Sequence, residues 1–195
     1  MKTIYILLSC TGTSTSRFIK MATNAEYTHA SIALIPSGHN MYSFGRRRPR
    51  NFLIGGFINE DINKHVLGKY PNAPCVVLAL DVSDKAYEKM EMMVSEFNRQ
   101  YDSYKYSFIG AATSFFGIKK NLRYRYTCSQ FVASMLYISD AVELPKHPSL
   151  MKPMDFLKIP ELRLVYKGEL SKIRFPKLDT TAHDFEKTAP NKAFG

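Results

Sequence analysis

The segment at residues 126–138, YTCSQFVASMLYI, combines a cysteine with the periodicity of a helix. From Phe131 onward its apolar residues recur at the spacing of one helix face, and Thr127 or Ser129 could serve as the N-cap. Cys128 then lies in or beside the first turn, where unpaired N–H groups and the helix dipole stabilise a thiolate nucleophile. The other interpretation is a small buried core residue, because free cysteines are commonly buried.

A histidine heads a predicted β-strand early in the chain. Residues 28–35 and 41–45 have the composition of the two strands of a hairpin, with a turn at 36–40. His29 begins the first strand, and Ser43 on the second is placed to contact its ring across the hairpin. Imidazole is the usual general base in enzymes, although a histidine at a strand end can equally be structural or solvated.

A cluster of arginines follows the second strand, at positions 46, 47, 48 and 50. Guanidinium groups offer forked donors that suit phosphate and carboxylate. We predict that Arg46 and Arg47 border the cleft containing His29 and bind an anionic group of the substrate. The alternative is a solvated loop. The Gly55-Gly56 pair that comes next indicates a backbone turn or the close approach of another segment.

The remaining pattern predicts further strands and helices that would position these residues. Apolar strands are expected at 3–9, 75–82 and 162–168, with helices after Ser83, at 104–118 and after Pro153. Together they predict an α+β fold in which an antiparallel sheet is packed against helices. Residues 1–175 are expected to form a single domain, because a chain of 195 residues most naturally makes one. Residues 176–195 are polar and aperiodic, which predicts a loose tail.

Composition narrows the choice of partners and cofactors. The net charge of +10 and the isoelectric point near 9.5 favour an anionic partner, such as a lipid surface or a polyanion. Nucleic acid is the less favoured choice, because no recognisable nucleic-acid-binding motif is present. The three cysteines are widely spaced and the five histidines form no HxxxH pattern, so neither a disulfide framework nor a metal site is predicted. No cofactor is expected.

The first ten residues, MKTIYILLSC, resemble the start of a lipoprotein signal. The apolar run at 4–8 is shorter than the about 7–15 residues of a signal core, so we interpret residues 3–9 as a buried strand. Elsewhere no apolar run approaches the ~18 residues needed to span a bilayer. A cytoplasmic location is therefore predicted, with lipid anchoring through Cys10 as the minor alternative.

Three segments together resemble a known family: THASIAL with its histidine, MYSFGR, and TCSQFVASML with its cysteine. Their types and order resemble the circularly permuted branch of the NlpC-type, papain-like cysteine hydrolases, which includes YiiX-like bacterial proteins and lecithin retinol acyltransferase. In papain-like enzymes generally the cysteine helix precedes the histidine strand, whereas in this branch it follows, as it does here. The resemblance covers about residues 3–170 and implies a permuted papain-like fold. The same combination of segments is also typical of small uncharacterised bacterial proteins.

Carried over residue by residue, the resemblance makes Cys128 the nucleophile and His29 the general base of an acyl transfer. The bond attacked would be an amide, ester or thioester in a small-molecule, peptide or lipid substrate. The family places a third, imidazole-orienting residue on the next strand, usually His, Asn, Gln or Glu, where this chain has Ser43. If Ser43 does not orient His29, the site is either a Cys–His dyad or is oriented by another residue, for example Glu60 or Asp61 after the glycine pair.

The same resemblance assigns one donor of an oxyanion hole to the backbone N–H of Cys128. Gln130, Tyr104 or Tyr106 would supply the second donor. A different class of function also fits the sequence, namely a non-catalytic or weakly active binding module that uses its basic surface on an anionic partner. An alkylation experiment on Cys128 separates the two, because only a catalytic pair needs a thiolate that depends on His29.

Overall fold

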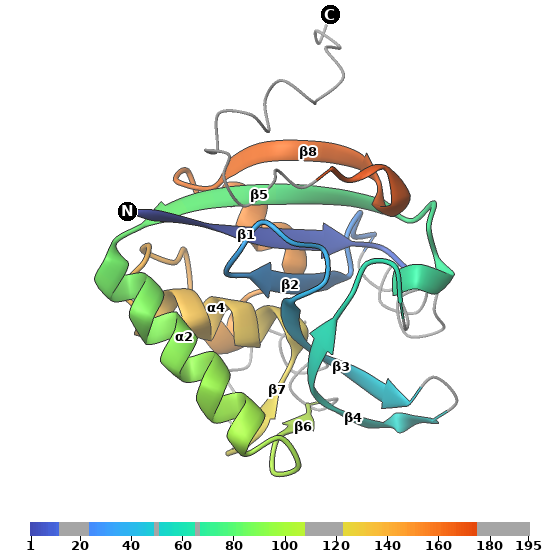
Figure 1. Ribbon diagram of the computed structural model, residues 1–195, viewed down its shortest axis with the longest axis horizontal. Coiled ribbons are helices and arrows are strands. Elements are labelled where there is room, and N and C mark those ends of the chain that lie inside the picture. The colour runs from blue at the N-terminus through green and yellow to red at the C-terminus, as the bar shows by residue number, and fades with distance from the viewer. Residues whose placement is uncertain (12–23, 49–50, 65–66, 108–122, 175–195) are drawn as a thin grey trace, which may run out of the picture.

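The computed structural model describes residues 1–11, 24–48, 51–64, 67–107 and 123–174, and Figure 1 shows how they are arranged. They form an eight-stranded sheet in the order β7-β6-β4-β3-β2-β1-β5-β8. All neighbouring strands are antiparallel except β6 and β7. The strands are β1 (Lys2–Ser9), β2 (His29–Ala33), β3 (Met41–Arg48), β4 (Asn51–Glu60), β5 (Pro74–Val82), β6 (Lys105–Tyr106), β7 (Arg125–Tyr126) and β8 (Arg163–Glu169).

Two α-helices, α2 (Asp84–Arg99) and α4 (Cys128–Ile138), lie together on one side of the sheet (Figure 1). Short 3₁₀-helices complete the described structure: Leu67–Lys69, Pro148–Leu150, Pro153–Lys158 and Leu170–Lys172. The predicted α+β class is therefore confirmed. The predicted tail at 176–195 lies outside the described residues.

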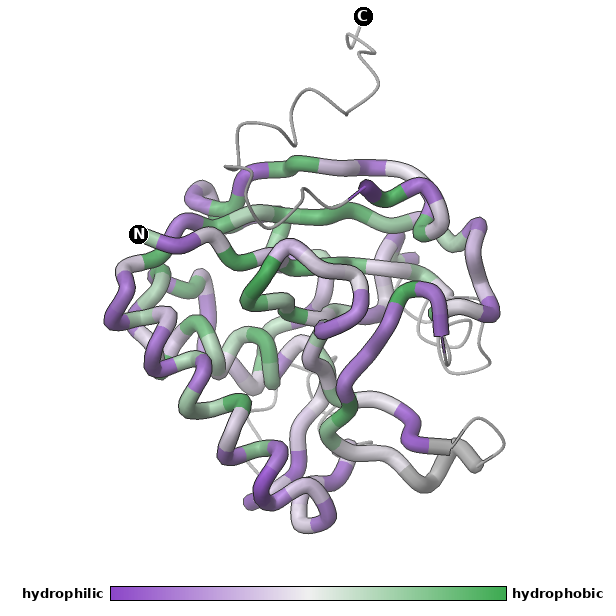
Figure 2. Tube along the Cα trace, viewed as in Figure 1, coloured by the Kyte–Doolittle hydropathy of each residue, from purple (hydrophilic) through white to green (hydrophobic). Residues whose placement is uncertain are grey.

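Strand β1 lies inside the sheet, paired with β2 on one side and β5 on the other. Its side chains alternate between two cores, as the two-residue period of a strand requires. Ile4, Ile6 and Leu8 join the core beneath the helices, whereas Tyr5 and Leu7 join a smaller core on the opposite face. Figure 2 shows the resulting apolar character of β1 and β5.

The helices bury the faces that their sequences predict. The hydroxyl of Ser83 accepts the backbone N–H of Ala86 at 3.1 Å and caps α2. Thr127 caps α4 in the same way, accepting the N–H of Gln130 at 3.1 Å. Helix α4 is buried from Cys128 through Ala133, so its first turns are covered on all sides, and only its last residues, Tyr137 and Ile138, are exposed.

The Gly55-Gly56 pair lies inside a strand and not in a turn. A side chain at Gly55 would meet the Cβ of Tyr106 at 2.8 Å, and one at Gly56 would meet the carbonyl oxygen of Tyr104 and the Arg47 guanidinium. The close-approach interpretation is therefore the correct one. The glycines let β6 lie against β4, in the register Gly56 opposite Lys105.

The predicted helix at 104–118 is wrong at its start. Lys105 and Tyr106 form strand β6, because their alternating polar and aromatic side chains suit a sheet that has one buried face. The remainder of that prediction, from residue 108, lies outside the described residues. Within the described part of the chain, no helix has the length and apolar character needed to cross a membrane.

Candidate active site

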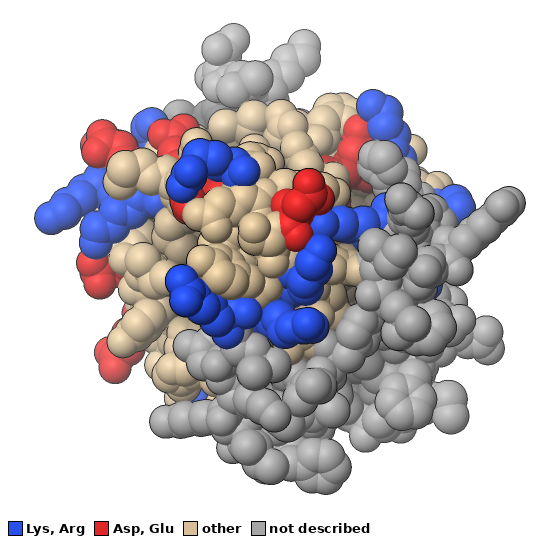
Figure 3. Space-filling view, turned by 90° about the horizontal axis from the view of Figure 1, so that it is seen from below, with Lys and Arg blue, Asp and Glu red and all other residues tan. Residues whose placement is uncertain are grey.

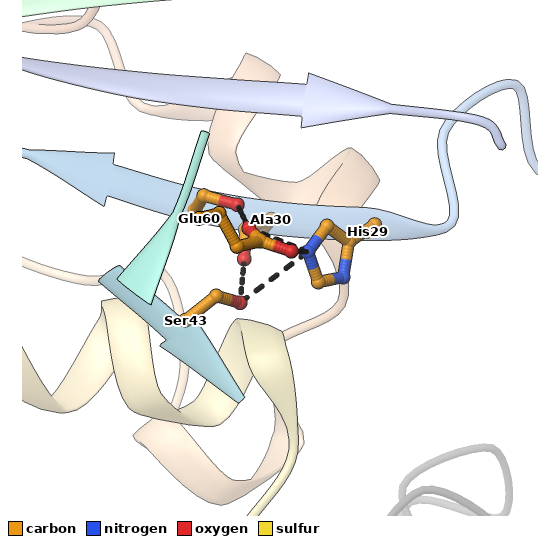
Figure 4. Close-up of polar contacts among 5 residues, drawn as sticks. His29, Ala30, Ser43 and Glu60 are labelled. Atoms are coloured by element: carbon orange, nitrogen blue, oxygen red, sulfur yellow. Dashed lines mark hydrogen bonds and ion pairs between the residues drawn. The ribbon is translucent and has the colours of Figure 1, made fainter. Parts of the chain in front are cut away.

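The site lies where strand β3 leaves strand β2. The two strands pair only through Ile32 with Tyr42 and Ala33 with Met41. Closer to the start of β2, the hydroxyl of Ser43 donates to the carbonyl oxygen of Ala30 at 2.7 Å (Figure 4). In a strand the N–H and C=O of one residue point to the same side, so the N–H of Ala30 also faces the space that β3 has left.

The thiol of Cys128 occupies this space. It is hydrogen bonded to His29, and the backbone N–H groups of Ala30 and Ser129 donate to its sulfur. Cys128 is 6% exposed, and the side chain of His29 is 19% exposed. The helix start that carries Cys128 and the strand start that carries His29 thus meet, although they are distant in the sequence.

Two opposing effects act on the pKa of Cys128. Burial raises it, whereas the hydrogen bond and positive charge of His29 and the N–H groups of Ala30 and Ser129 lower it. The contributions that lower the pKa are together larger than the effect of burial, so the pKa of Cys128 lies below that of an ordinary thiol. The site therefore favours the thiolate form of Cys128 more than an ordinary environment does.

The ring of His29 is held by a carboxylate. Its Nε2 lies 3.0 Å from both Oε1 and Oε2 of Glu60, which leaves Nδ1 as the ring nitrogen for Cys128 (Figure 4). Burial lowers the pKa of His29, but the Glu60 charge and the hydrogen bonds to Cys128 and Glu60 raise it well above its usual value. The shifts of His29 and Cys128 together favour an imidazolium beside a thiolate.

Glu60 is itself fixed by a second contact. The hydroxyl of Ser31, which is fully buried on β2, donates to Oε2 of the carboxylate. Glu60 is 7% exposed at the end of β4 and reaches across β3 to these partners. The carboxylate therefore has little freedom to turn away from His29.

The sequence predicts Ser43 as the residue that orients His29, with a Cys–His dyad or another residue, such as Glu60 or Asp61, as the alternatives. The structure puts Ser43 next to the ring, with its Oγ 3.4 Å from Nε2, but this hydroxyl donates its proton to Ala30. Glu60 makes the shorter and charged contact with Nε2. Asp61, the other alternative, instead contacts His39 at 3.0 Å and the backbone N–H of Asn63 at 2.8 Å.

Replacing Ser43 by alanine tests this assignment. The Ala30 carbonyl would lose its buried partner, which should lower the free energy of unfolding by about 1–3 kcal/mol in urea titrations. Any activity that depends on Cys128 should fall by no more than about tenfold, because a neutral hydrogen bond is lost and the Glu60 contact remains. A loss as large as that of Glu60→Gln would instead assign the orienting role to Ser43.

Among the residues predicted as oxyanion donors, Tyr106 is the one that interacts electrostatically with Cys128. Burial raises its pKa and a charge on Cys128 raises it further, while Arg46 acts in the opposite direction, so the phenol keeps its proton. Tyr104 instead joins an aromatic cluster, with its ring centroid 4.5 Å from that of Phe97. Gln130 is buried in the first turn of α4.

The two arginines predicted to bind substrate have different environments. Arg47 holds the segment after α2 in place. Its guanidinium donates to the carbonyls of Tyr101 and Tyr104, the latter at 3.2 Å, and lies 3.6 Å from the Tyr101 ring centroid. The side chain of Arg47 is only 10% exposed, so its guanidinium is largely occupied by these contacts, and its predicted contact with substrate stays a prediction. Arg46 is half-buried and acts electrostatically on Tyr106.

The other thiols differ from Cys128. Cys75 is fully buried in β5, and burial raises its pKa to about 12. Cys10 is partly exposed after β1. Among the described residues, no group of His, Cys, Asp and Glu side chains is arranged to hold a metal ion.

Comparisons with known proteins identify no relative of this chain. No protein-family model matches the chain, and neither the curated proteins nor the solved structures contain a match. Arguments about function therefore depend on the geometry of Cys128, His29 and Glu60.

Proposed function

We propose that this protein is a cysteine-dependent hydrolase or acyltransferase that acts on an amide, ester or thioester bond. The observation that carries the proposal is the contact of Cys128 with His29, whose other ring nitrogen faces the Glu60 carboxylate. A nucleophile, a base and an acidic residue that orients the base form the usual catalytic arrangement of acyl transfer. A buried structural thiol would have a raised pKa, as Cys75 does.

The reaction would begin with attack of the Cys128 thiolate on the carbonyl carbon of the substrate. The C=O electron pair moves onto oxygen, and the tetrahedral intermediate then collapses and breaks the bond to the leaving group. The His29 imidazolium gives its proton to that group. The acyl group is now bound to Cys128 as a thioester. Neutral His29 takes a proton from water or from an acceptor molecule, and the oxygen or other nucleophilic atom so activated attacks this thioester. Cys128 then leaves as a thiolate.

The developing negative charge on the substrate oxygen needs hydrogen-bond donors. The backbone N–H of Cys128 belongs to the first turn of α4, where N–H groups have no partner within the helix. We assign the second donor to the phenol of Tyr106, since its raised pKa keeps it protonated beside the thiolate.

We also propose that the chain belongs to the permuted NlpC-type, papain-like hydrolases. Support comes from the order of the segments, because the strand with His29 precedes the helix that begins at Cys128. The sheet lies against that helix, as such a fold requires. Glu60 supplies a residue type that the family uses for orientation, although it comes from β4 rather than from the strand next to His29.

Alkylation of Cys128 by iodoacetamide at different pH values tests the proposal. The lowered pKa of Cys128 should make the thiol react below pH 8, where an ordinary thiol is mostly protonated. Replacing His29 by alanine removes the largest contribution that lowers this pKa, so the reactivity should move to higher pH. For acyl transfer itself a bell-shaped profile is expected, rising through the lowered pKa of Cys128 and falling through the raised pKa of His29.

A site-specific readout is needed because the chain contains three cysteines. Digestion and mass spectrometry after brief labelling assign the rate to Cys128. A rate that is slow at neutral pH and the same in the His29→Ala variant would contradict the enzyme and favour the alternative, a binding module without chemistry.

A further inference from the structure

Three neighbouring strands bring Arg46 and Tyr106 to either side of one glycine. Arg46 on β3 is opposite Gly55 on β4, and a Cβ on Gly55 would lie 2.8 Å from the Cβ of Tyr106 on β6. Residues that are directly opposite one another point to the same face of a sheet. Because Gly55 has no side chain, Arg46 and Tyr106 are neighbours across β4.

The side chain of Arg46 projects to the face of the sheet that carries α4. The ring of Phe44, two residues earlier on β3, lies 5.3 Å from that of Phe131 in α4, measured between centroids. Side chains alternate along a strand, so Arg46 shares the face of Phe44, whereas Arg47 projects to the opposite face. Arg46 is therefore on the same side of the sheet as the helix that begins at the nucleophile.

The phenol of Tyr106 connects Arg46 to the nucleophile. Tyr106 is opposite Tyr126, which comes two residues before Cys128 in the chain. A charge on Cys128 raises the pKa of Tyr106 and the charge of Arg46 lowers it, so both groups act on the same phenol. Arg46 is half-buried, and salt screens such a charge less than an exposed one. An anion that approaches the thiol beside Tyr106 therefore meets the field of Arg46.

Two further cations, Lys105 and Arg125, project to the other face of the sheet. Lys105 comes one position before Tyr106 and pairs with Arg125, so both point away from the phenol. Figure 3 shows Lys and Arg side chains gathered on the face seen from below, the side on which β6 and β7 lie in Figure 1. This positive surface attracts anions to the region, but Arg46 is the cation that shares the face of Tyr106.

We propose that Arg46 binds a carboxylate of the substrate, and that this carboxylate lies only a few bonds from the scissile carbonyl. The inference rests on the proposed function, since it places the carbonyl carbon at Cys128 and its oxygen at Tyr106. Strands β3 and β6 are two steps apart in the sheet, or roughly 10 Å between backbones, and the two side chains flank the same glycine. A short spacer therefore joins the two groups that they bind.

The chemistry of arginine favours a carboxylate as this anion. A guanidinium donates two parallel hydrogen bonds to the two oxygens of a carboxylate, which fixes both the position and the orientation of the bound group. The substrate class is accordingly an amide, ester or thioester that carries its own carboxylate close to the bond that is broken.

Two chloroacetamides that differ in one terminal group test the proposal. N-chloroacetylglycine ends in a carboxylate, and N-chloroacetylglycinamide ends in a neutral amide of the same shape. The Cys128 sulfur attacks the CH₂ carbon, a C–S bond forms and chloride leaves, so labelling needs a nucleophile but no turnover. At an ionic strength of about 0.15 M the carboxylate compound should label Cys128 about tenfold faster or more, the effect of one charge-assisted hydrogen bond. Equal rates, or a slower carboxylate compound, would overturn the site.

Substitutions of Arg46 locate the effect. The quantity compared is the rate ratio of the carboxylate to the amide compound, since a change in thiol reactivity alters both rates alike. Arg46→Gln should lower this ratio about fivefold or more. Arg46→Lys keeps the charge but loses the forked donors, so its ratio should be intermediate. An Arg46→Gln variant with the wild-type ratio would contradict the proposal.

Arg125→Gln is the matched control. It removes the same charge three positions from Cys128 in the chain, but from the opposite face of the sheet. Its ratio should equal that of the wild type. A loss equal to that of Arg46→Gln would show that only net charge matters, which also overturns the site.

A longer pair of compounds tests the spacing. In 6-(chloroacetamido)hexanoic acid and its amide the reactive group is the same, but the terminal group is separated from it by additional methylenes. The ratio for this pair should be much smaller than for the glycine pair. A ratio that is equal or larger would overturn the short spacer.

Iodoacetamide labelling separates the two levels of inference. A fast, His29-dependent reaction with iodoacetamide, combined with equal rates for the glycine pair, would overturn the carboxylate site and leave the proposed nucleophile intact. Slow labelling by iodoacetamide would instead remove the proposed function and this inference with it.

Discussion

Replacing Cys128 by alanine is expected to abolish acyl transfer, with a loss on the order of 10⁴-fold or more, because the thiol that would form the covalent intermediate is removed. The substitution should leave the fold intact. Thr127 still caps α4, and His29 still has its contacts with Glu60 at 3.0 Å. Turnover of an activated ester or thioester, measured together with the circular dichroism of the variant, checks both parts.

The chain supplies matched controls for this result in its other cysteines. Cys75→Ala removes a thiol whose pKa is raised to about 12 by burial in β5, and it should change the stability but not the activity per folded molecule. Cys10→Ala removes a partly exposed thiol outside the site. Full activity in the Cys128→Ala variant, or loss of activity in the Cys10→Ala variant, would move the chemistry to another part of the molecule.

Replacing Glu60 by glutamine should lower kcat by up to about 10⁴-fold, the effect of turning the acidic member of a catalytic triad into an amide. The shape of the side chain is preserved, but the negative charge beside His29 is lost. That charge raises the pKa of His29, and the imidazolium lowers the pKa of Cys128. In the variant the pKa of His29 should fall and that of Cys128 should rise, so the active pH range becomes narrower from both sides.

Asp61→Asn is the control for the loss of charge at Glu60. It removes the same charge from the adjacent residue, whose partners are His39, Asn63 and Lys64 rather than His29. Its pH profile should match that of the wild type. If Glu60→Gln retained the full rate and the wild-type profile, His29 would be oriented without the carboxylate, and the site would be a Cys–His dyad.

The sequence predicts the parts of this structure whose signals are local. Strand β1 follows from a continuous apolar run, and α2 and α4 follow from helical periodicity that begins just after a capping residue. Cys128 could be placed at a helix start because Thr127 and the apolar face are only a few residues away. His29 could be placed at a strand start for the same kind of reason.

Local signals in the sequence do not predict which strands pair with one another or in which register. Strand β4 runs through Gly55 and Gly56, for which the sequence leaves a turn and a close approach equally open, and the approach of β6 decides between them. Glu60 reaches His29 because β4 returns beside β3, and no spacing in the sequence measures that distance. Arg46 and Arg47 are adjacent in the chain, yet they project to opposite faces of β3 and so have different partners.

The divergence of β3 from β2 also determines when the thiol becomes reactive. In an unfolded chain Cys128 has neither the imidazole of His29 nor the N–H of Ala30, so it is an ordinary thiol of which a few per cent is ionised at pH 7. The nucleophile is completed only when the start of α4 docks beside the start of β2. Reactivity at neutral pH therefore reports native assembly at this junction. Followed through a urea titration, it would show whether α4 separates from β2 before the rest of the molecule unfolds.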